Sequence, residues 1–261
     1  MRINETKRKL RAGETVIGVI VGEYAPVALE VVGQLRFDFV MIDCEHGSMS
    51  LDQVENLVRA SESFSITPLA RVPDHMPSTI LRFLDRGVQG VIVPHVNSAA
   101  EAEAVVRAAR YWPEGERSIG TTRAHDYAIG VTREESTRFL NEQVMVLPMC
   151  EHVEAVANLE AILQVPGIDV IHIAANDLTQ SMGFPDPAEV RRTMIDAISK
   201  TRAAGIAAGV GGNNPSDAAG VANLIKAGAN FVTISLLGLI QMGAAKFRAD
   251  LELALSSAIK E

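Results

Sequence analysis

The sequence predicts a single (β/α)8 TIM barrel spanning residues 1–261. Barrels of this kind commonly form one domain at this length. Short runs rich in β-branched apolar residues alternate with amphipathic stretches, as expected for strand–helix units around a parallel sheet. About eight such runs occur, the number that closes a barrel. The predicted strands are Val16–Val21, Phe37–Cys44, Thr67–Val72, Gly90–Val96, Val144–Cys150, Val170–Ala175, Ala207–Gly211 and Phe231–Ile234.

The stretches between these runs carry residues that usually mark helix ends. Ser98 precedes a helical pattern over Glu101–Tyr111, and Gly205 closes the helix that begins near Pro187. A doubly wound open sheet is the alternative fold, but the residues after the first strand lack a glycine-rich phosphate turn. The least regular stretch, Pro113–Glu142, is predicted to be a long connection before the fifth strand.

Composition limits the classes of function. Lys+Arg number 24 against 32 Asp+Glu, a net charge of -8, and no basic stripe occurs, so we expect no nucleic-acid partner. Residues 1–15 are polar and no later stretch is apolar enough to span a bilayer, so we expect a cytoplasmic protein without a membrane segment. Cys44 and Cys150 show neither a metal-binding spacing nor a disulfide framework, and are predicted to be buried thiols.

Charged side chains gather where the predicted strands end. Active sites of barrels form at the carboxyl ends of the strands, so these residues are candidates for chemistry. They are Asp43, Glu45 and His46 at the second strand, Arg71 in the third, Glu151 and His152 after the fifth, and Asp177 after the sixth. His152 is left undecided, and the histidines outside this group are predicted to be ordinary loop or core residues: His75, His95, His125 and His172.

Strand alternation sorts these residues by side. Asp43 and Glu45 share one side, while Cys44 points to the other, among the helices. Two carboxylates from adjacent strands can hold a hard cation and leave positions open for substrate oxygens. A single acid at a strand end is more often a helix cap or an ion-pair partner, and Asp177 stays open to that interpretation. The same alternation places Met149 with Glu151 and Ala175 with Asp177.

Five short motifs occur in order along nearly the whole chain. They are Asp43-x-Glu45-His46-Gly47, Arg71-Val72-Pro73, Leu84-Asp85-x-Gly87-x-x-Gly90-x-x-x-Pro94, Tyr111-x-Pro113-x-Gly115-x-Arg117 and Asp177-Leu178-x-Gln180-Ser181-Met182-Gly183. Each is weak alone, but the ordered set resembles the HpcH/HpaI family of class II, metal-dependent pyruvate aldolases. The resemblance implies a phosphoenolpyruvate/pyruvate-type barrel in a homo-oligomer, often a hexamer, with terminal helices exchanged between neighbours.

The resemblance also implies roles for single residues. Glu151 and Asp177 would bind a divalent metal, Mg2+, Mn2+ or Co2+, and His46 would be the base. Arg71 would stabilise negative charge on the keto oxygen of the substrate. Asp85 matches an acid that raises the basicity of the histidine. Since the third helix of a barrel ends near the N-terminal face, we expect any pairing of Asp85 with a histidine to cross a subunit interface.

Several positions of the predicted substrate pocket depart from the family pattern. Met149 stands where the family usually has Gln, and Ala174-Ala175 stands where it has Gly-Pro. Gly211 replaces a bulky residue, and residues 235–237 replace a Gly-x-Asp motif. We therefore expect the metal site and the acid–base residues to be intact, and the binding of the donor and the shape of the acceptor pocket to be altered. The residues predicted to bind substrate are Asp43, Glu45, Met149, Ala175, Asn176 and Gly211.

Together these residues predict an aldolase, a carbon–carbon lyase that forms or cleaves 4-hydroxy-2-oxo acids. Its partners would be a small 2-oxo acid, pyruvate or hydroxypyruvate, reacting through its enolate, and an aldehyde acceptor. Two alternatives stay open: a related lyase that acts on an acyl-CoA or decarboxylates a 2-oxo diacid, and a silent barrel that only binds a 2-oxo acid. A Schiff-base aldolase needs a lysine inside the barrel, whereas the lysines fall in the N-terminal segment or on predicted helices: Lys7, Lys9, Lys200, Lys226, Lys246 and Lys260.

Overall fold

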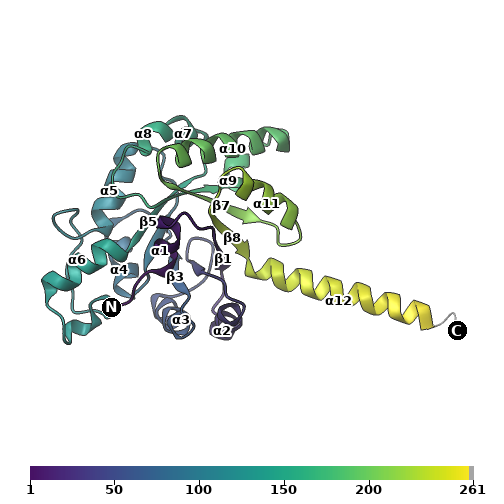
Figure 1. Cartoon of the computed structure of the whole chain (residues 1–261), viewed down its shortest axis with the longest axis horizontal. Helices are drawn as coiled ribbons and strands as arrows, with labels where there is room; N and C mark the ends of the chain where they lie inside the picture. The colour runs from purple at the N-terminus through teal and green to yellow at the C-terminus, as the bar shows by residue number, and fades with distance from the viewer. Residues whose placement is uncertain (259–261) are drawn as a thin grey trace.

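Eight parallel strands close into a barrel in sequence order, which confirms the predicted TIM-barrel fold (Figure 1). The structure is a computed structural model that describes residues 1–258. Each strand pairs with the next, and β8 pairs with β1 to close the ring. The strands are β1 (Val16–Val21), β2 (Phe39–Asp43), β3 (Thr67–Arg71), β4 (Gly90–Val93), β5 (Met145–Cys150), β6 (Val170–Ala174), β7 (Ala207–Asn213) and β8 (Phe231–Ser235).

Helices surround this barrel in the outer layer of Figure 1. Ser98 caps α5 with a capping box, as its place before an apolar-periodic stretch predicts. The stretch predicted as a long connection is more ordered than expected, because Thr132 forms a capping box with Glu135 and starts α6 within it. The helices are α1 (Glu5–Arg11), α2 (Pro26–Gln34), α3 (Leu51–Ser63), α4 (Pro77–Asp85), α5 (Ala99–Ala109), η1 (Arg123–Ala128), α6 (Arg133–Gln143), α7 (Val153–Ala157), α8 (Leu159–Ile162), α9 (Ala175–Ser181), α10 (Pro187–Ala203), α11 (Ala218–Lys226) and α12 (Leu236–Ala258).

Alternate residues of the strands build two separate cores. One set fills the barrel interior, where the rings of Phe39 and Phe231 stack at 4.1 Å between centroids and Met149 packs in the same cluster. The other set packs between the strands and the helices, and Cys44 and Cys150 belong to it. The cysteines thus point away from the barrel interior, as strand alternation predicts. Burial raises the pKa of each thiol to about 12.

The N-terminal segment lies at the amino ends of the strands. Lys7 is buried there, and its ammonium group donates to the carbonyl of Val144 and pairs with Asp169 at 2.9 Å. The other lysines of the described chain lie on α1, α10, α11 and α12, and Lys260 lies outside the described residues. No lysine of residues 1–258 therefore occupies the carboxyl ends of the strands, which argues against Schiff-base chemistry there.

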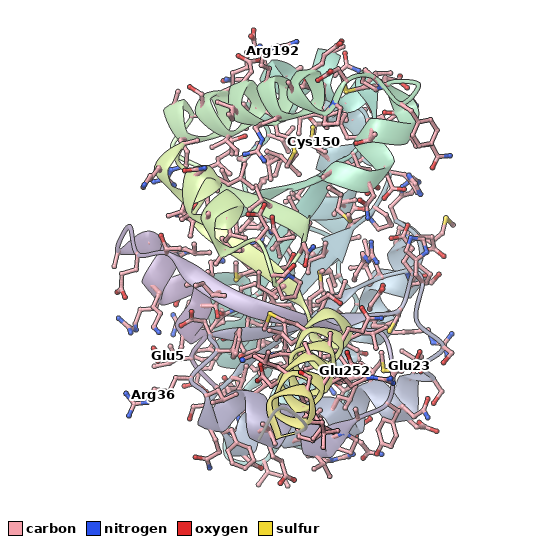
Figure 2. The ribbon with its side chains drawn as sticks, turned by 90° about the vertical axis from the view of Figure 1, so that its right-hand side faces the viewer. Glu5, Glu23, Arg36, Cys150, Arg192 and Glu252 are labelled. Carbon is pink, nitrogen blue, oxygen red and sulfur yellow. The ribbon has the colours of Figure 1, made fainter. Side chains whose placement is uncertain are left out.

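The C-terminal helix α12 extends away from the barrel (Figure 1). In Figure 2 the same helix, marked by Glu252, points toward the viewer. Large apolar side chains along it are exposed: Leu237, Ile240, Met242, Phe247, Leu251, Leu253 and Leu255. Such a surface is unfavourable in water, since each exposed apolar side chain forgoes on the order of 1.5–3 kcal/mol of burial. Within residues 1–258, no helix is both long enough and apolar enough to cross a bilayer.

Candidate active site

Asp43 and Arg71 form the centre of the site at the carboxyl ends of β2 and β3. The two residues are direct partners in the register of the parallel pair. The Arg71 guanidinium donates from Nε and Nη2 to the two carboxylate oxygens of Asp43, at 2.9 and 2.7 Å. Its Nη1 lies 2.9 Å from Oε2 of Glu45. Arg71 is only 7% exposed, so one buried cation joins two acids that sequence alternation places on the same side.

Asp43 also orders the turn after β2. Its Oδ1 accepts hydrogen bonds from the backbone N–H groups of Glu45 and His46, at 3.2 and 3.3 Å. Burial alone would raise the pKa of Asp43, but these bonds and the adjacent Arg71 bring it below its usual value. The chain must approach itself closely here, because a Cβ on Gly47 would lie 2.1 Å from the carbonyl oxygen of Asp43. Asp43 is therefore an ionised residue that positions Arg71 and the Glu45–His46 turn.

Glu151 is the most deeply buried acid of the site, with 2% exposure directly after β5. Its Oε1 accepts a hydrogen bond of 2.8 Å from the backbone N–H of His95. Burial raises the pKa of Glu151 above its usual value; the bond from His95 lowers it, and the charges of Glu45 and Asp177 raise it further. This carboxylate thus faces other acids and has no arginine or lysine partner among the described residues.

His95 lies between two of these acids, which corrects the prediction that it is an ordinary loop or core residue. It follows β4, and its backbone has a φ of 56° in the left-handed region. Its Nδ1 is 3.4 Å from Oε1 of Glu151, and its Nε2 is 3.4 Å from Oε1 of Glu45. One ligand atom from each of Glu45, His95 and Glu151 can be chosen so that the three lie within 4.8 Å of one another. Sequence reasoning missed this cluster, although His95 follows the end of a barrel strand.

Asp177 reaches the site from a helix rather than from a strand. β6 ends at Ala174 and α9 begins at Ala175, so strand alternation does not relate Ala175 to Asp177 as predicted. Asp177 is in the first turn of α9 and is not its N-cap, which is Ala174. A carboxylate in the first turn is favoured by the helix dipole. Its charge nevertheless acts on Glu151, as expected for two acids that face one region.

The remaining histidines divide between structural and accessible positions. His46 is 67% exposed, and its Nε2 is 4.0 Å from Oε2 of Glu45. His152 caps α7 through its Nδ1, which accepts a hydrogen bond from the backbone N–H of Glu154. His125 is buried against Tyr111 and Ser136, as expected for a core residue. The ring of His46 is therefore accessible, whereas those of His125 and His152 make structural hydrogen bonds.

The predicted substrate residues occupy different depths. Met149 is buried in the barrel interior below the acids. Ala175 is half-buried and Asn176 is exposed at the start of α9. Gly211 lies in β7, where a Cβ would come within 2.6 Å of Nε2 of His172, a fully buried imidazole whose pKa burial lowers to about 3. Glycine at position 211 thus leaves room for the neutral ring of His172.

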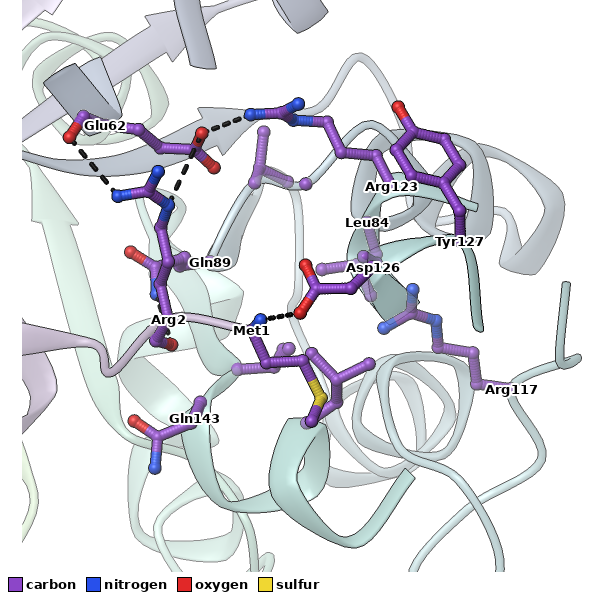
Figure 3. Close-up of a pocket in the computed structure, with 15 residues that line it drawn as sticks. Met1, Arg2, Glu62, Leu84, Gln89, Arg117, Arg123, Asp126, Tyr127 and Gln143 are labelled. Carbon is purple, nitrogen blue, oxygen red and sulfur yellow. Dashed lines mark hydrogen bonds and ion pairs between the residues drawn. The ribbon is translucent and has the colours of Figure 1, made fainter. Parts of the chain in front are cut away.

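Asp85 lies apart from the other predicted residues. It ends α4, and its Oδ1 accepts a hydrogen bond of 2.9 Å from Arg117, whose side chain is fully buried. Arg117 lines a cavity of about 210 Å3 beside the amino ends of β4 and β5 (Figure 3). The Met1 amino group pairs with Asp126 in the same cavity. Within the described chain Asp85 therefore contacts Arg117 rather than His46, which follows the opposite, carboxyl end of β2.

The acids fit a divalent cation by their chemistry. Carboxylate oxygens are preferred by Mg2+ and Mn2+, and imidazole suits Co2+ and similar ions. Glu151 is buried close to other acids and pairs with no arginine or lysine of residues 1–258, an arrangement that a bound cation stabilises. Arg71 supplies a fixed positive charge beside these acids, and His46 supplies an accessible imidazole. The arrangement can stabilise a negatively charged oxygen and move a proton next to it.

Several known proteins similar to this chain are described as aldolases. A family model described as HpcH/HpaI aldolase/citrate lyase matches residues 17–254. The 4-hydroxy-2-oxovalerate aldolase of Rhodococcus jostii (strain RHA1) is 39% identical over 215 residues, which cover 80% of this chain and 81% of the relative. The hydroxypyruvate/pyruvate aldolase of Pseudomonas aeruginosa is 35% identical over 211 residues, which cover 80% and 78%. The crystal structure of an HpcH/HpaI aldolase from Desulfitobacterium hafniense DCB-2 superposes with a TM-score of 0.85 at 26% identity and covers 94% of this chain and 96% of that one.

Proposed function

The chain belongs to the HpcH/HpaI aldolase/citrate lyase family and is a carbon–carbon lyase of the aldolase type, and from this premise we propose its reaction. It forms and cleaves 4-hydroxy-2-oxo acids, with pyruvate or hydroxypyruvate as the donor and an aldehyde as the acceptor. In cleavage the C3–C4 bond breaks, the 4-hydroxyl proton leaves, and C3 of the released 2-oxo acid takes up a proton. The main support for this reaction is the buried Arg71, which Asp43 and Glu45 hold in place. Arg71 lies close enough to Glu151 to sense its charge, and the exposed His46 is close to Glu45.

Glu151 and Asp177 are the residues that would hold a divalent metal, either Mg2+, Mn2+ or Co2+. Such a cation withdraws electron density from the 2-oxo group and thereby acidifies the neighbouring C–H bond. The burial of Glu151 and the charge that Asp177 exerts on it support this assignment. Two carboxylates from the protein are enough ligands for such a site, because water and substrate oxygens can fill the remaining positions of the metal.

Arg71 would stabilise the negative charge that develops on the keto oxygen. Asp43 and Glu45 fix the guanidinium in place before substrate arrives, since both acids contact it at 2.9 Å or less. A preorganised cation of this kind needs little rearrangement during the reaction. Its low exposure strengthens its effect, because water screens charge poorly in a buried site.

His46 would move the proton at C3 of the donor. Histidine is the side chain best suited to proton transfer near neutral pH. The high exposure of His46 leaves its ring free to turn toward a substrate, and Glu45 lies close enough to orient it. Met149, Ala175, Asn176 and Gly211 would line the donor and acceptor pocket, with Asp43 and Glu45 acting through Arg71.

We further propose that the protein is a cytoplasmic homo-oligomer, by family resemblance a hexamer, in which α12 packs on a neighbouring subunit. The exposed apolar side chains of α12 support this packing, because a monomer leaves them in water. In such an assembly Asp85 would act on a histidine of a neighbouring subunit, as the family resemblance implies. The unpaired thiols of Cys44 and Cys150 agree with a reducing compartment.

A coupled cleavage assay tests the reaction. The purified oligomer is given a 4-hydroxy-2-oxo acid with Mg2+, Mn2+, Co2+ or a chelator, and released pyruvate is followed by NADH consumption with lactate dehydrogenase. We expect metal-dependent release that Glu151→Gln abolishes and Glu154→Gln, an exposed neighbour on α7, leaves unchanged. Full activity with chelator, or pyruvate release by Glu151→Gln at the wild-type rate, would contradict the proposal. Release of carbon dioxide from a 2-oxo diacid, or turnover of an acyl-CoA, without aldol cleavage would favour the related-lyase alternatives.

A further inference from the structure

The backbone of His95 adopts an unusual left-handed conformation shortly after β4. A non-glycine residue with a φ of 56° is uncommon, and the conformation persists only where surrounding contacts fix it. The fixing contact is the bond of 2.8 Å from its own N–H to the buried carboxylate of Glu151. This turn places the imidazole over the site with 64% of its side chain exposed. The backbone thus positions a ring that packing does not require.

Each nitrogen of this ring faces a different acid of the site. Nδ1 is 3.4 Å from Oε1 of Glu151, and Nε2 is 3.4 Å from Oε1 of Glu45. Glu45 is in turn held by Arg71 at 2.9 Å. Arg71, Glu45 and His95 therefore form a chain of polar contacts that ends at Glu151.

The 3.4 Å separation suits two ligands of one ion. Metal–nitrogen and metal–oxygen bonds of about 2.1 Å place neighbouring ligands of an octahedral ion roughly 3 Å apart and opposite ligands roughly 4 Å apart. Metal-binding histidines usually donate their second ring N–H to a carboxylate, which fixes the tautomer and the ring orientation. Glu45 is in place for that bond, and Glu151 is in place as the neighbouring ligand.

We propose that Nδ1 of His95 is a nitrogen ligand of the divalent metal bound by Glu151, with Nε2–H of His95 donating to Glu45. The proposal rests on the proposed metal-dependent function and adds a nitrogen to its carboxylate ligands. Imidazole binds Co2+ better than Mg2+, which prefers oxygen ligands. His95 therefore biases the site toward transition metals.

Pulsed electron paramagnetic resonance of the Mn2+-loaded oligomer tests the proposal without measuring activity. A directly bonded imidazole gives 14N modulation of the Mn2+ signal, and labelling with 15N-histidine assigns that modulation to histidine. We expect it in the wild type, in His46→Gln and in the control His75→Gln, whose exposed side chain lies outside the site. We expect its loss in His95→Gln, which still binds Mn2+ through carboxylates.

Metal affinity provides the second measurement. By calorimetric titration, His95→Gln should bind Co2+ about tenfold or more weakly, with a much smaller change for Mg2+. Equal losses for both ions, or 14N modulation that persists in His95→Gln, would overturn the proposal. Mn2+ binding without any 14N modulation in the wild type would overturn it while leaving the metal site of the proposed function intact. Failure of the wild type to bind any of these ions would overturn both.

Discussion

Arg71→Met tests whether the buried guanidinium stabilises the two acids around it and supports activity. Methionine retains most of the length and apolar contact of the arginine stem but removes the charge and every hydrogen bond of the guanidinium. Asp43 and Glu45 then remain buried without the cation that both contact in the wild type. We expect loss of activity together with a large loss of stability.

The magnitude follows from the burial of the pair. Removing one partner of a buried ion pair costs about 3–5 kcal/mol, because it leaves the other charge buried and unpaired. A loss of 1 kcal/mol lowers the melting temperature of a protein of this size by roughly 2–4 °C, so Arg71→Met should melt about 10 °C below the wild type. Arg82→Met, on the exposed side of α4, should change it by no more than about 2 °C.

The pH dependence of this difference has a defined sign. The pKa of Asp43 is lowered, so its stabilising contribution is present above the unfolded value of about 3.9 and is lost as pH falls through the folded value. In Arg71→Met, burial without a cation raises that pKa, and the variant takes up a proton at a higher pH. The gap in melting temperature should therefore narrow between pH 7 and pH 4. A gap of under 2 °C at pH 7, or one that widens toward pH 4, would refute this reasoning.

Three further predictions concern other parts of the molecule. Glu151→Gln should remove metal binding and raise the melting temperature of the metal-free protein at pH 8. Burial is the main cause that raises the pKa of Glu151, so the wild type loses stability as pH rises through that pKa, and the gain in melting temperature should shrink in acid. Gly211→Ala should cost about 1–3 kcal/mol in denaturant unfolding, because its Cβ would meet the His172 ring, whereas a Cβ at Gly22 has open space and Gly22→Ala should not destabilise. Phe247→Asp combined with Leu251→Asp should reduce the mass measured by light scattering while the circular dichroism of the barrel persists; an unchanged mass would exclude α12 from the interface.

The barrel could be predicted from the sequence because its strands are short, apolar and regularly spaced. All eight lie where the pattern places them, and the largest difference is at β4, which ends at Val93 rather than Val96. Pro94 has no N–H to donate to the sheet, and His95 turns into the left-handed region. An apolar pattern alone does not reveal such a turn.

The site could be predicted in part. Asp43 meets Arg71 because the two residues are partners in the parallel pairing of β2 and β3. Glu45 lies beyond the end of β2, and the turn that Asp43 orders brings it to Arg71. Asp177 comes from a helical turn that begins one residue earlier than expected, so an argument from strand alternation did not apply.

His95 was missed for a different reason. Its chain neighbours are Pro94 and Val96, so nothing nearby in the sequence indicates an acidic environment. Closure of the barrel brings Glu45 and Glu151 to it from two other strand ends. The predicted strand Gly90–Val96 already placed His95 at a carboxyl end, where barrel chemistry lies, but the absence of charged chain neighbours led to its interpretation as an ordinary residue.

Exchange of the pyruvate methyl protons in D2O is a direct test of the proposed enolate chemistry, because it reports formation of the enolate without an acceptor. The methyl signal is followed by NMR with Mg2+, Mn2+ or Co2+, with and without chelator, for the wild type and His46→Ala. We predict metal-dependent loss of the signal in the wild type and no such loss in His46→Ala, which should fold normally because the His46 side chain is 67% exposed. Absence of exchange with both pyruvate and hydroxypyruvate, or exchange at the wild-type rate in His46→Ala, would contradict it.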